Sequence, residues 1–196
     1  MAILAPSIKA LQHLLTICGE YCDEWDICLN AKKSRNLYFG KRTTISYNVT
    51  LNGGIVEWAD EWVYLGVTLK SSKSFDCSVT DRIKKFYRCS NSIFRIDGRS
   101  NGMVTLRLIE THCVPILTYA IEIIEVLNRD ERRQLRVAYN SIFRKIFNYR
   151  WSESVSALQG FLERPTWEQL VERRRSGFVN RLLSSNPDLL TRRLLM

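Results

Sequence analysis

The spacing of apolar residues along the chain changes near residue 74. Before that point, Ser7 is a residue type that favours helix N-termini, and apolar residues follow it at helical spacing over 8–26. Strand-like patterns come next. Beyond residue 74 the spacing is helical again and stays so. The pattern therefore predicts a domain boundary near residue 73, within a short Lys/Ser-rich stretch.

Short strands are predicted between the first helix and this boundary. Residues 45–51 alternate between apolar and polar, Asn52-Gly53 signals a two-residue turn, and 55–58 fits the returning strand. A second alternation covers 63–69, and Leu37-Tyr38-Phe39 resembles a short buried strand. The predicted fold class is α+β, with short antiparallel strands followed by helices.

Four helices are predicted after the boundary. Ser78-x-x-Asp81, Asn128-x-x-Glu131 and Thr166-x-x-Gln169 resemble capping boxes at the starts of the first, third and fourth helices. The second helix is expected over 104–127 with a bend at Pro115, because proline interrupts helical hydrogen bonding. A short tail helix is expected after residue 187.

The first of these helices has two contrasting faces. One arc of its helical wheel carries the apolar and small residues Val79, Ile83, Phe86, Tyr87, Ser90, Ile93 and Phe94. Lys84, Arg88 and Arg95 lie within about 40° of one another on the opposite arc, at about 100° per residue. We therefore predict a packed face and a basic face on this helix.

The net charge of +9 is concentrated in the middle of the chain. Residues 79–150 carry 14 basic and 7 acidic residues, whereas residues 1–78 carry 8 of each. A basic segment of this kind fits a polyanionic partner, and it equally fits an ordinary solvated surface.

The six cysteines predict neither a disulfide scaffold nor a metal site. Only Cys18 and Cys22 form a close pair, and the two histidines are far apart, whereas a zinc site needs four ligands. We predict buried free thiols, which favours a reducing compartment. The chain has no run of about 18 apolar residues and no convincing signal peptide. We expect no membrane contact and an intracellular location, nuclear or cytoplasmic.

Three segments in a fixed order resemble one protein family. Met1-Ala-Ile-Leu-Ala-Pro-Ser7 precedes the first helix, Leu29-Asn-Ala-Lys-Lys-Ser34 follows it, and Trp62-Val-Tyr-Leu-Gly-Val-Thr-Leu69 precedes the basic helix. Their order and spacing resemble the end of the palm and the thumb of reverse transcriptases from non-LTR (LINE-like) retrotransposons. The resemblance covers most of the chain and is strongest over 1–70.

The resemblance implies a domain arrangement and an activity. Residues 1–73 would be the C-terminal part of the palm with a primer-grip hairpin, 74–150 a helical basic thumb, and 151–196 a helical extension. The family synthesises DNA from dNTPs on an RNA template and a DNA primer, and the intact enzyme needs Mg²⁺. The family's paired aspartates should stand immediately before Met1, so we expect a fragment that is inactive alone.

The same resemblance suggests roles in the first domain. Lys33, within Asn30-x-x-Lys33-Ser34, would lie near the incoming triphosphate, where a lysine supplies a proton and positive charge to the departing pyrophosphate. Tyr64, Leu65 and Gly66 would form the primer grip, because glycine permits close approach of backbone to the primer strand. The structural alternatives are an exposed loop lysine, with Lys32 competing for the role, and a plain edge hairpin.

The basic helix would contact the template–primer duplex through Lys84, Arg88 and Arg95. A polymerase moves along any sequence, so these contacts should be to phosphates and sugars rather than base edges. Weaker candidates have acidic neighbours: Arg129, Arg132, Arg133, Arg144 and Arg173–Arg175. For the whole chain, the alternatives are a non-enzymatic nucleic-acid-binding helical module and, less favoured, a protein-interaction module with exposed apolar surface.

Overall fold

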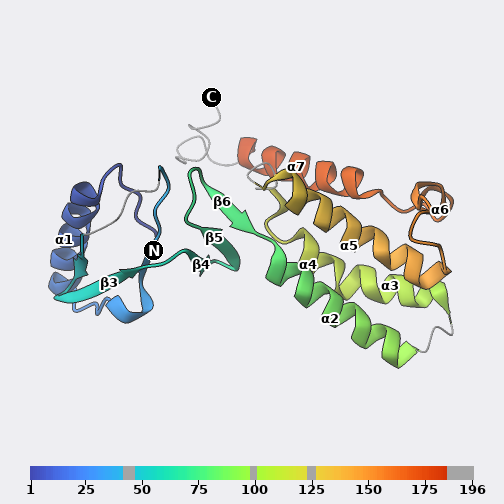
Figure 1. Ribbon diagram of the computed structural model, residues 1–196, viewed down its shortest axis with the longest axis horizontal. Helices are drawn as coiled ribbons and strands as arrows, with labels where there is room; N and C mark the ends of the chain where they lie inside the picture. Colours follow the sequence, from blue (N-terminus) through green and yellow to red (C-terminus); the bar gives the residue numbers. More distant parts are fainter. Residues whose placement is uncertain (42–46, 98–100, 123–126, 185–196) are drawn as a thin grey trace. The chain divides into compact units, whose positions relative to one another are not determined.

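A computed structural model describes residues 1–41, 47–97, 101–122 and 127–184 (Figure 1). The fold is α+β, as predicted. Its contacts divide the chain into two compact units, Met1–Cys77 and Ser78–Met196. This division falls a few residues after the boundary that the sequence predicts near residue 73. The first unit contains one long helix and the strands, and the second unit is helical.

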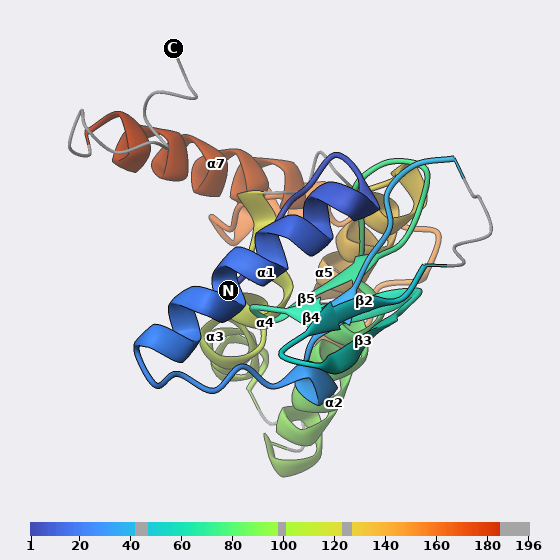
Figure 2. The ribbon, with the colours of Figure 1, turned by 90° about the vertical axis from the view of Figure 1, so that its left-hand side faces the viewer.

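The first unit is built on helix α1 (Ile8–Glu24). Ser7 caps it as predicted, because its Oγ accepts a hydrogen bond from the backbone N–H of Ala10 at 3.2 Å. Helix α1 packs against strand β2 (Val49–Leu51), as Figure 2 shows. Leu15 joins residues of the strands in a small core. That core consists of Leu15, Val49, Leu51 and Val56.

A three-stranded sheet with the order β1-β3-β2 covers this helix. Strand β3 (Gly54–Trp58) pairs antiparallel with β2 through the predicted Asn52-Gly53 turn, whose φ angles are 48° and 73°. Strand β1 is Arg35–Asn36 and runs parallel to β3, so the prediction that the strands are antiparallel is wrong for this pair. The prediction of a strand over Leu37-Tyr38-Phe39 is therefore wrong, because the observed strand ends at Asn36. The buried Asn36 side chain donates a hydrogen bond to the Val56 carbonyl at 2.9 Å.

A second sheet has the order β4-β5-β6, from Glu61–Tyr64, Val67–Lys70 and Asp76–Ser78. The alternation over 63–69 is not one strand with a buried face, because the chain reverses between β4 and β5. Val63 and Leu65 are consequently exposed. The sequence pattern predicts extended backbone here, and the hairpin follows from the Leu65-Gly66 turn.

The second unit contains six described helices (Figure 1). They are α2 (Thr80–Asp97), α3 (Gly102–His112), α4 (Val114–Thr118), α5 (Arg129–Phe147), α6 (Ser156–Phe161) and α7 (Trp167–Leu183). The predicted caps of α5 and α7 are confirmed: Asn128 Oδ1 accepts from the Glu131 N–H at 2.9 Å, and Thr166 with Gln169 forms a complete capping box. The expected tail helix lies outside the described residues.

Two helix starts differ from the prediction. Helix α2 begins at Thr80, whose N–H donates to Ser78 Oγ at 3.3 Å, while Asp81 pairs with Lys84 instead of closing a capping box. The prediction of a single bent helix over 104–127 is wrong. Two helices are present instead, because α3 ends at His112 and α4 starts at Val114. Pro115 falls in the first turn of α4, where its missing N–H breaks no helical bond.

The helical unit has the larger core. Its fully buried side chains include Phe86, Leu106, Ile109, Leu117, Leu135 and Phe143. Buried Tyr139 packs on Trp167, and its hydroxyl donates to the Pro165 carbonyl at 2.9 Å. Burial raises the pKa of Tyr139 well above its usual range, so its phenol stays neutral and can donate this bond.

The six cysteines are free, as predicted. Cys22, Cys77 and Cys113 are buried, whereas Cys28 is exposed and departs from the expectation of buried thiols. Burial raises the pKa of Cys113, which lies 2.9 Å from Cys89 Sγ, so Cys113 stays a neutral thiol. None of the described helices has the length and apolar composition needed to cross a bilayer.

Candidate nucleic-acid interface

The segment around Lys33 is a capped turn. Residues Ala31–Lys33 form a short 3₁₀ helix, η1, and Asn30 Oδ1 accepts from the Lys33 N–H at 3.1 Å. Ser34 Oγ donates to the Asn30 carbonyl at 2.9 Å. The spacing Asn30-x-x-Lys33-Ser34 therefore has a local structural reason, because both polar residues close the turn. The side chains of Lys32 and Lys33 are exposed.

Arg35 connects this turn to the hairpin that carries the predicted primer grip. Its guanidinium lies 5.0 Å from the ring centroid of Trp62 on β4 and 3.2 Å from the Glu57 carboxylate on β3. The same group donates to the carbonyls of Lys32 and Ser34, each at 2.7 Å. Arg35 therefore holds the lysine turn next to β4. The sequence prediction missed it, although a basic residue beside the motif was a signal.

The predicted grip residues occupy the tip of the β4–β5 hairpin. Tyr64 pairs with Val67 across the strands, so Leu65 and Gly66 are the two turn residues. Their φ angles are 46° and 76°, which is the left-handed region. This conformation costs a leucine roughly 1–2 kcal/mol of conformational free energy, whereas it costs glycine little. The Leu65 side chain is 74% exposed, so the turn presents an apolar residue to solvent on a strained backbone.

The three predicted thumb residues are exposed on α2. Lys84, Arg88 and Arg95 point away from the packed face, on which Phe86 and Ser90 are buried. Lys84 Nζ lies 3.7 Å from Asp81 Oδ1, but both groups are mostly exposed, so this pair contributes little and can open toward a phosphate. The structure thus places these three basic side chains on one helix face in the second unit. Lys33 and the hairpin are in the first unit.

The described residues do not form a metal centre. No group of three or more His, Cys, Asp or Glu side chains within residues 1–41, 47–97, 101–122 and 127–184 could hold a metal ion. The Mg²⁺ that the resemblance implies therefore has no fitting set of ligands among these residues. We assign no step through a metal to them.

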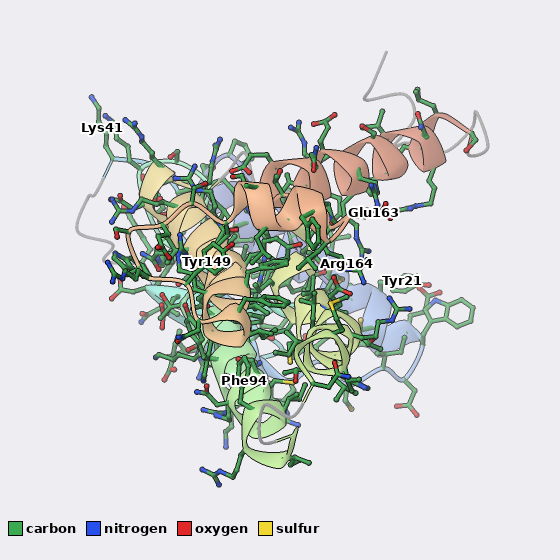
Figure 3. All side chains as sticks on the ribbon, turned by 90° about the vertical axis from the view of Figure 1, so that its right-hand side faces the viewer. Tyr21, Lys41, Phe94, Tyr149, Glu163 and Arg164 are labelled. Carbon is green, nitrogen blue, oxygen red and sulfur yellow. The ribbon has the colours of Figure 1, made fainter. Side chains whose placement is uncertain are left out.

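Arg144, one of the weaker candidates from the sequence, has more specific surroundings than its sequence neighbours indicate. Its guanidinium lies 5.3 Å from the ring centroid of Trp151, and both residues line a groove beside α2 and α5. Phe94 and Tyr149 line the same groove, and both can be followed in Figure 3. Sequence reasoning placed Arg144 among several surface arginines, because its aromatic neighbour comes from the loop after α5.

Comparison with known proteins places nearly the whole chain beside polymerases of mobile elements. It is 27% identical, over 97% of its length, to the RNA-directed DNA polymerase from mobile element jockey of Drosophila funebris. It is 26% identical, over 95% of its length, to the Drosophila melanogaster protein named "Probable RNA-directed DNA polymerase from transposon BS". The jockey polymerase of Drosophila melanogaster is 23% identical over 98% of the chain.

These matches confirm the resemblance to RNA-directed DNA polymerases of non-LTR retrotransposons. The chain spans about a fifth of the length of these curated relatives, 21% in each. No family model matches the sequence. No solved structure matches it either.

Proposed function

We propose that this chain is the part of a non-LTR retrotransposon reverse transcriptase that holds the template–primer duplex. The observation that carries the proposal is the similarity to RNA-directed DNA polymerases along 95–98% of the chain. In the proposed arrangement, residues 1–73 are the end of the palm, 74–150 the thumb, and 151–196 an extension. The ligands are an RNA template, a DNA primer and, in the longer polymerase, dNTPs and Mg²⁺.

The first unit supplies a rigid edge for the primer terminus. The Leu65-Gly66 turn is a two-residue hairpin loop with little conformational freedom, so its backbone can contact the primer at a fixed position. Arg35 holds Lys33 close to this hairpin through Trp62. Lys33 is exposed and would place a proton donor and a positive charge near the departing pyrophosphate.

The second unit supplies a sequence-independent grip on the duplex. Lys84, Arg88 and Arg95 share one exposed face of α2 and can contact successive phosphates. Such contacts neutralise backbone charge without reading bases, as a polymerase needs when it moves along any template. We further propose an intracellular location, nuclear or cytoplasmic.

Charge reversal on α2 tests the proposal. The parent chain should bind a labelled RNA–DNA primer–template duplex, measured by fluorescence anisotropy. Converting Lys84, Arg88 and Arg95 to Glu should abolish most of that binding. The matched control converts Lys9 on α1, Arg107 on α3 and Arg181 on α7 to Glu, because these three residues are exposed, are not candidate contacts and change the net charge equally. Equal losses in both variants, or no loss in the first, would contradict the assignment.

The runner-up function is a non-enzymatic nucleic-acid-binding helical module. It predicts the same duplex binding by α2 but gives Lys33 and the hairpin no role in nucleotide incorporation. The two functions therefore differ in the first unit, and a longer polypeptide that includes the upstream polymerase residues separates them. If that longer polypeptide binds the duplex but incorporates no nucleotides, the helical-module alternative is favoured.

A further inference from the structure

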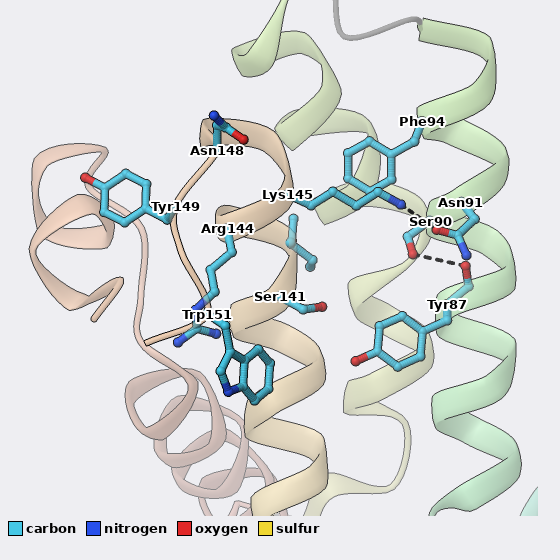
Figure 4. A pocket seen from close by; sticks show the side chains of 11 residues that line it. Tyr87, Ser90, Asn91, Phe94, Ser141, Arg144, Lys145, Asn148, Tyr149 and Trp151 are labelled. Atoms are coloured by element: carbon cyan, nitrogen blue, oxygen red, sulfur yellow. Dashed lines mark hydrogen bonds between the residues drawn. The ribbon is translucent and has the colours of Figure 1, made fainter. Parts of the chain in front are cut away.

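A groove of about 540 Å³ lies beside α2 and the C-terminal end of α5 (Figure 4). Four aromatic and two basic side chains contribute to its lining, together with serine and asparagine side chains, and none of the lining residues is acidic. Grooves of this size hold small ligands or one segment of a larger one. The combination of aromatic rings and positive charge is typical of sites for single-stranded nucleic acid.

Trp151 is the most exposed of the aromatic side chains in this groove. Asn148 ends α5 in a left-handed conformation, and the following turn brings Trp151 next to Arg144. The indole is 70% exposed, although tryptophan side chains are highly buried on average in folded proteins. The stacked Arg144 guanidinium fixes the orientation of the ring, and most of the ring remains open.

Arg144 also carries an unused hydrogen-bond donor. Its Nη2 donates to the Glu153 carbonyl at 3.2 Å, which holds the guanidinium in place. Among the residues that the structure describes, its Nε is buried and finds no hydrogen-bond partner. A buried guanidinium donor without a partner carries a desolvation cost.

Lys145 supplies a second positioned charge. Its Nζ lies 4.2 Å from the ring centroid of Phe94 and donates to Asn91 Oδ1 at 2.7 Å, shown as a dashed line in Figure 4. Tyr87 projects from α2 on the same side of the groove as Phe94 (Figure 4). Basic residues at the end of α5 are favoured by the helix dipole, so their presence alone is ordinary. Their attachment to aromatic rings is what distinguishes this site.

The groove continues from the basic face of α2. At about 100° per residue, Asn91 lies about 20° from Lys84 on the helical wheel, and Tyr87 lies about 60° from it. Arg88 and Arg95 lie on the other side of Lys84. A nucleic acid strand on the basic face can therefore pass Asn91 and enter the groove without crossing an acidic residue that lines it.

We propose that this groove binds an unpaired nucleotide of a single-stranded segment, with its base stacked on Trp151 and its phosphate near Arg144 and Lys145. The inference rests on the proposed nucleic-acid-holding function and adds a second ligand form, a single strand beside the duplex. Base stacking is tolerant of sequence because every base has a π-face. The site therefore suits a polymerase that must accept any template.

Paired oligonucleotides test this site in the full chain. Binding of labelled oligothymidylate of about twelve nucleotides is compared with binding of an abasic strand of the same length, within the usual site sizes for such proteins. The abasic strand keeps the phosphates and lacks the bases. Trp151→Ala should weaken oligothymidylate binding about five- to 150-fold, since each stacked base contributes about 1–3 kcal/mol. Binding of the abasic strand should stay unchanged.

Two further variants serve as controls. Phe161→Ala removes an aromatic ring that is 86% exposed on α6 and outside the groove, so it should change neither affinity. Trp151→Phe should restore part of the lost affinity, because a smaller ring still stacks. Circular dichroism should show a parental helix content in each variant.

The outcomes separate this inference from the proposed function. If Trp151→Ala weakens both strands equally, or neither, base stacking in the groove is excluded while duplex binding through α2 stands. If the parent binds duplex but not oligothymidylate, the groove is not a single-strand site. If the parent binds no nucleic acid of either form, the proposed function fails together with the inference.

Discussion

The two hairpins of the first unit share a turn geometry but differ in the residues that form it. Asn52-Gly53 joins β2 to β3 and Leu65-Gly66 joins β4 to β5, and all four residues have φ between 46° and 76°. Asparagine and glycine adopt this left-handed conformation at little cost, whereas leucine does not. In the first turn local preference and structure agree, and in the second they conflict.

The two hairpins also differ in how much of their apolar surface is buried. The β2–β3 hairpin contributes Val49, Leu51 and Val56 to the core of its unit, so its role is explained by packing. The β4–β5 hairpin exposes Val63 and Leu65 instead. Positions that violate a local preference without a packing gain are often functional. The contrast therefore supports the second hairpin, rather than the first, as the surface that meets the primer.

The largest expected effect concerns the lysine turn that Arg35 holds beside the second hairpin. In a polypeptide extended upstream through the polymerase's catalytic aspartates, Lys33→Ala should slow single-turnover nucleotide incorporation by about 100-fold, at the lower end for a general acid. Template–primer affinity should be nearly unchanged, because a proton donor at the leaving group acts in the transition state.

Lys32→Ala is the matched control for this prediction, since Lys32 is equally exposed in the same turn. It should have a much smaller effect on the rate. Equal effects of the two substitutions, or a Lys33→Ala defect confined to binding, would show that the turn has only a structural role.

A smaller effect is expected at the second position of each turn. Gly53→Ala and Gly66→Ala should each destabilise their hairpin by about 1–2 kcal/mol, the cost of an L-residue in the left-handed region. A Cβ at Gly53 would meet no atom within 4 Å, so its cost is purely conformational. Native-state hydrogen exchange of the β3 and β5 amides measures both. A neutral Gly66→Ala would mean that the second turn does not hold this geometry in solution.

The smallest expected effect concerns Leu65, whose left-handed backbone conflicts with the conformational preference of leucine. Leu65→Asn should stabilise the β4–β5 hairpin by about 1 kcal/mol, and Asn52→Leu should destabilise the β2–β3 hairpin by a similar amount. The same hydrogen-exchange experiment reports both changes. A destabilising Leu65→Asn would show that packing of the leucine side chain outweighs the strain of its left-handed backbone.

Local features of this fold could be predicted from the sequence, and distant pairings could not. Ser7, Asn128 and Thr166 were identified as caps because a cap depends on residues within one turn. The Asn52-Gly53 turn was identified for the same reason. The break at Cys113 was missed, because proline is compatible with the first turn of a new helix as well as with a bend.

The candidate sites follow the same rule. The periodicity of α2 places Lys84, Arg88 and Arg95 on one exposed face, as the structure shows. Arg35 stacking on Trp62 and Arg144 on Trp151 were not predicted, because each joins separate elements. Neither pair has a periodic signal in the sequence. Their surroundings become visible only when the chain is folded.

The salt dependence of duplex binding tests the central claim, that α2 grips the phosphate backbone. If the parent chain neutralises about four phosphates, a log–log plot of affinity against salt should have a slope near −3 to −4. Replacing Lys84, Arg88 and Arg95 with Gln should flatten that slope by about 2.7, since each lost contact removes about 0.9. A slope that the three substitutions leave unchanged would contradict the account.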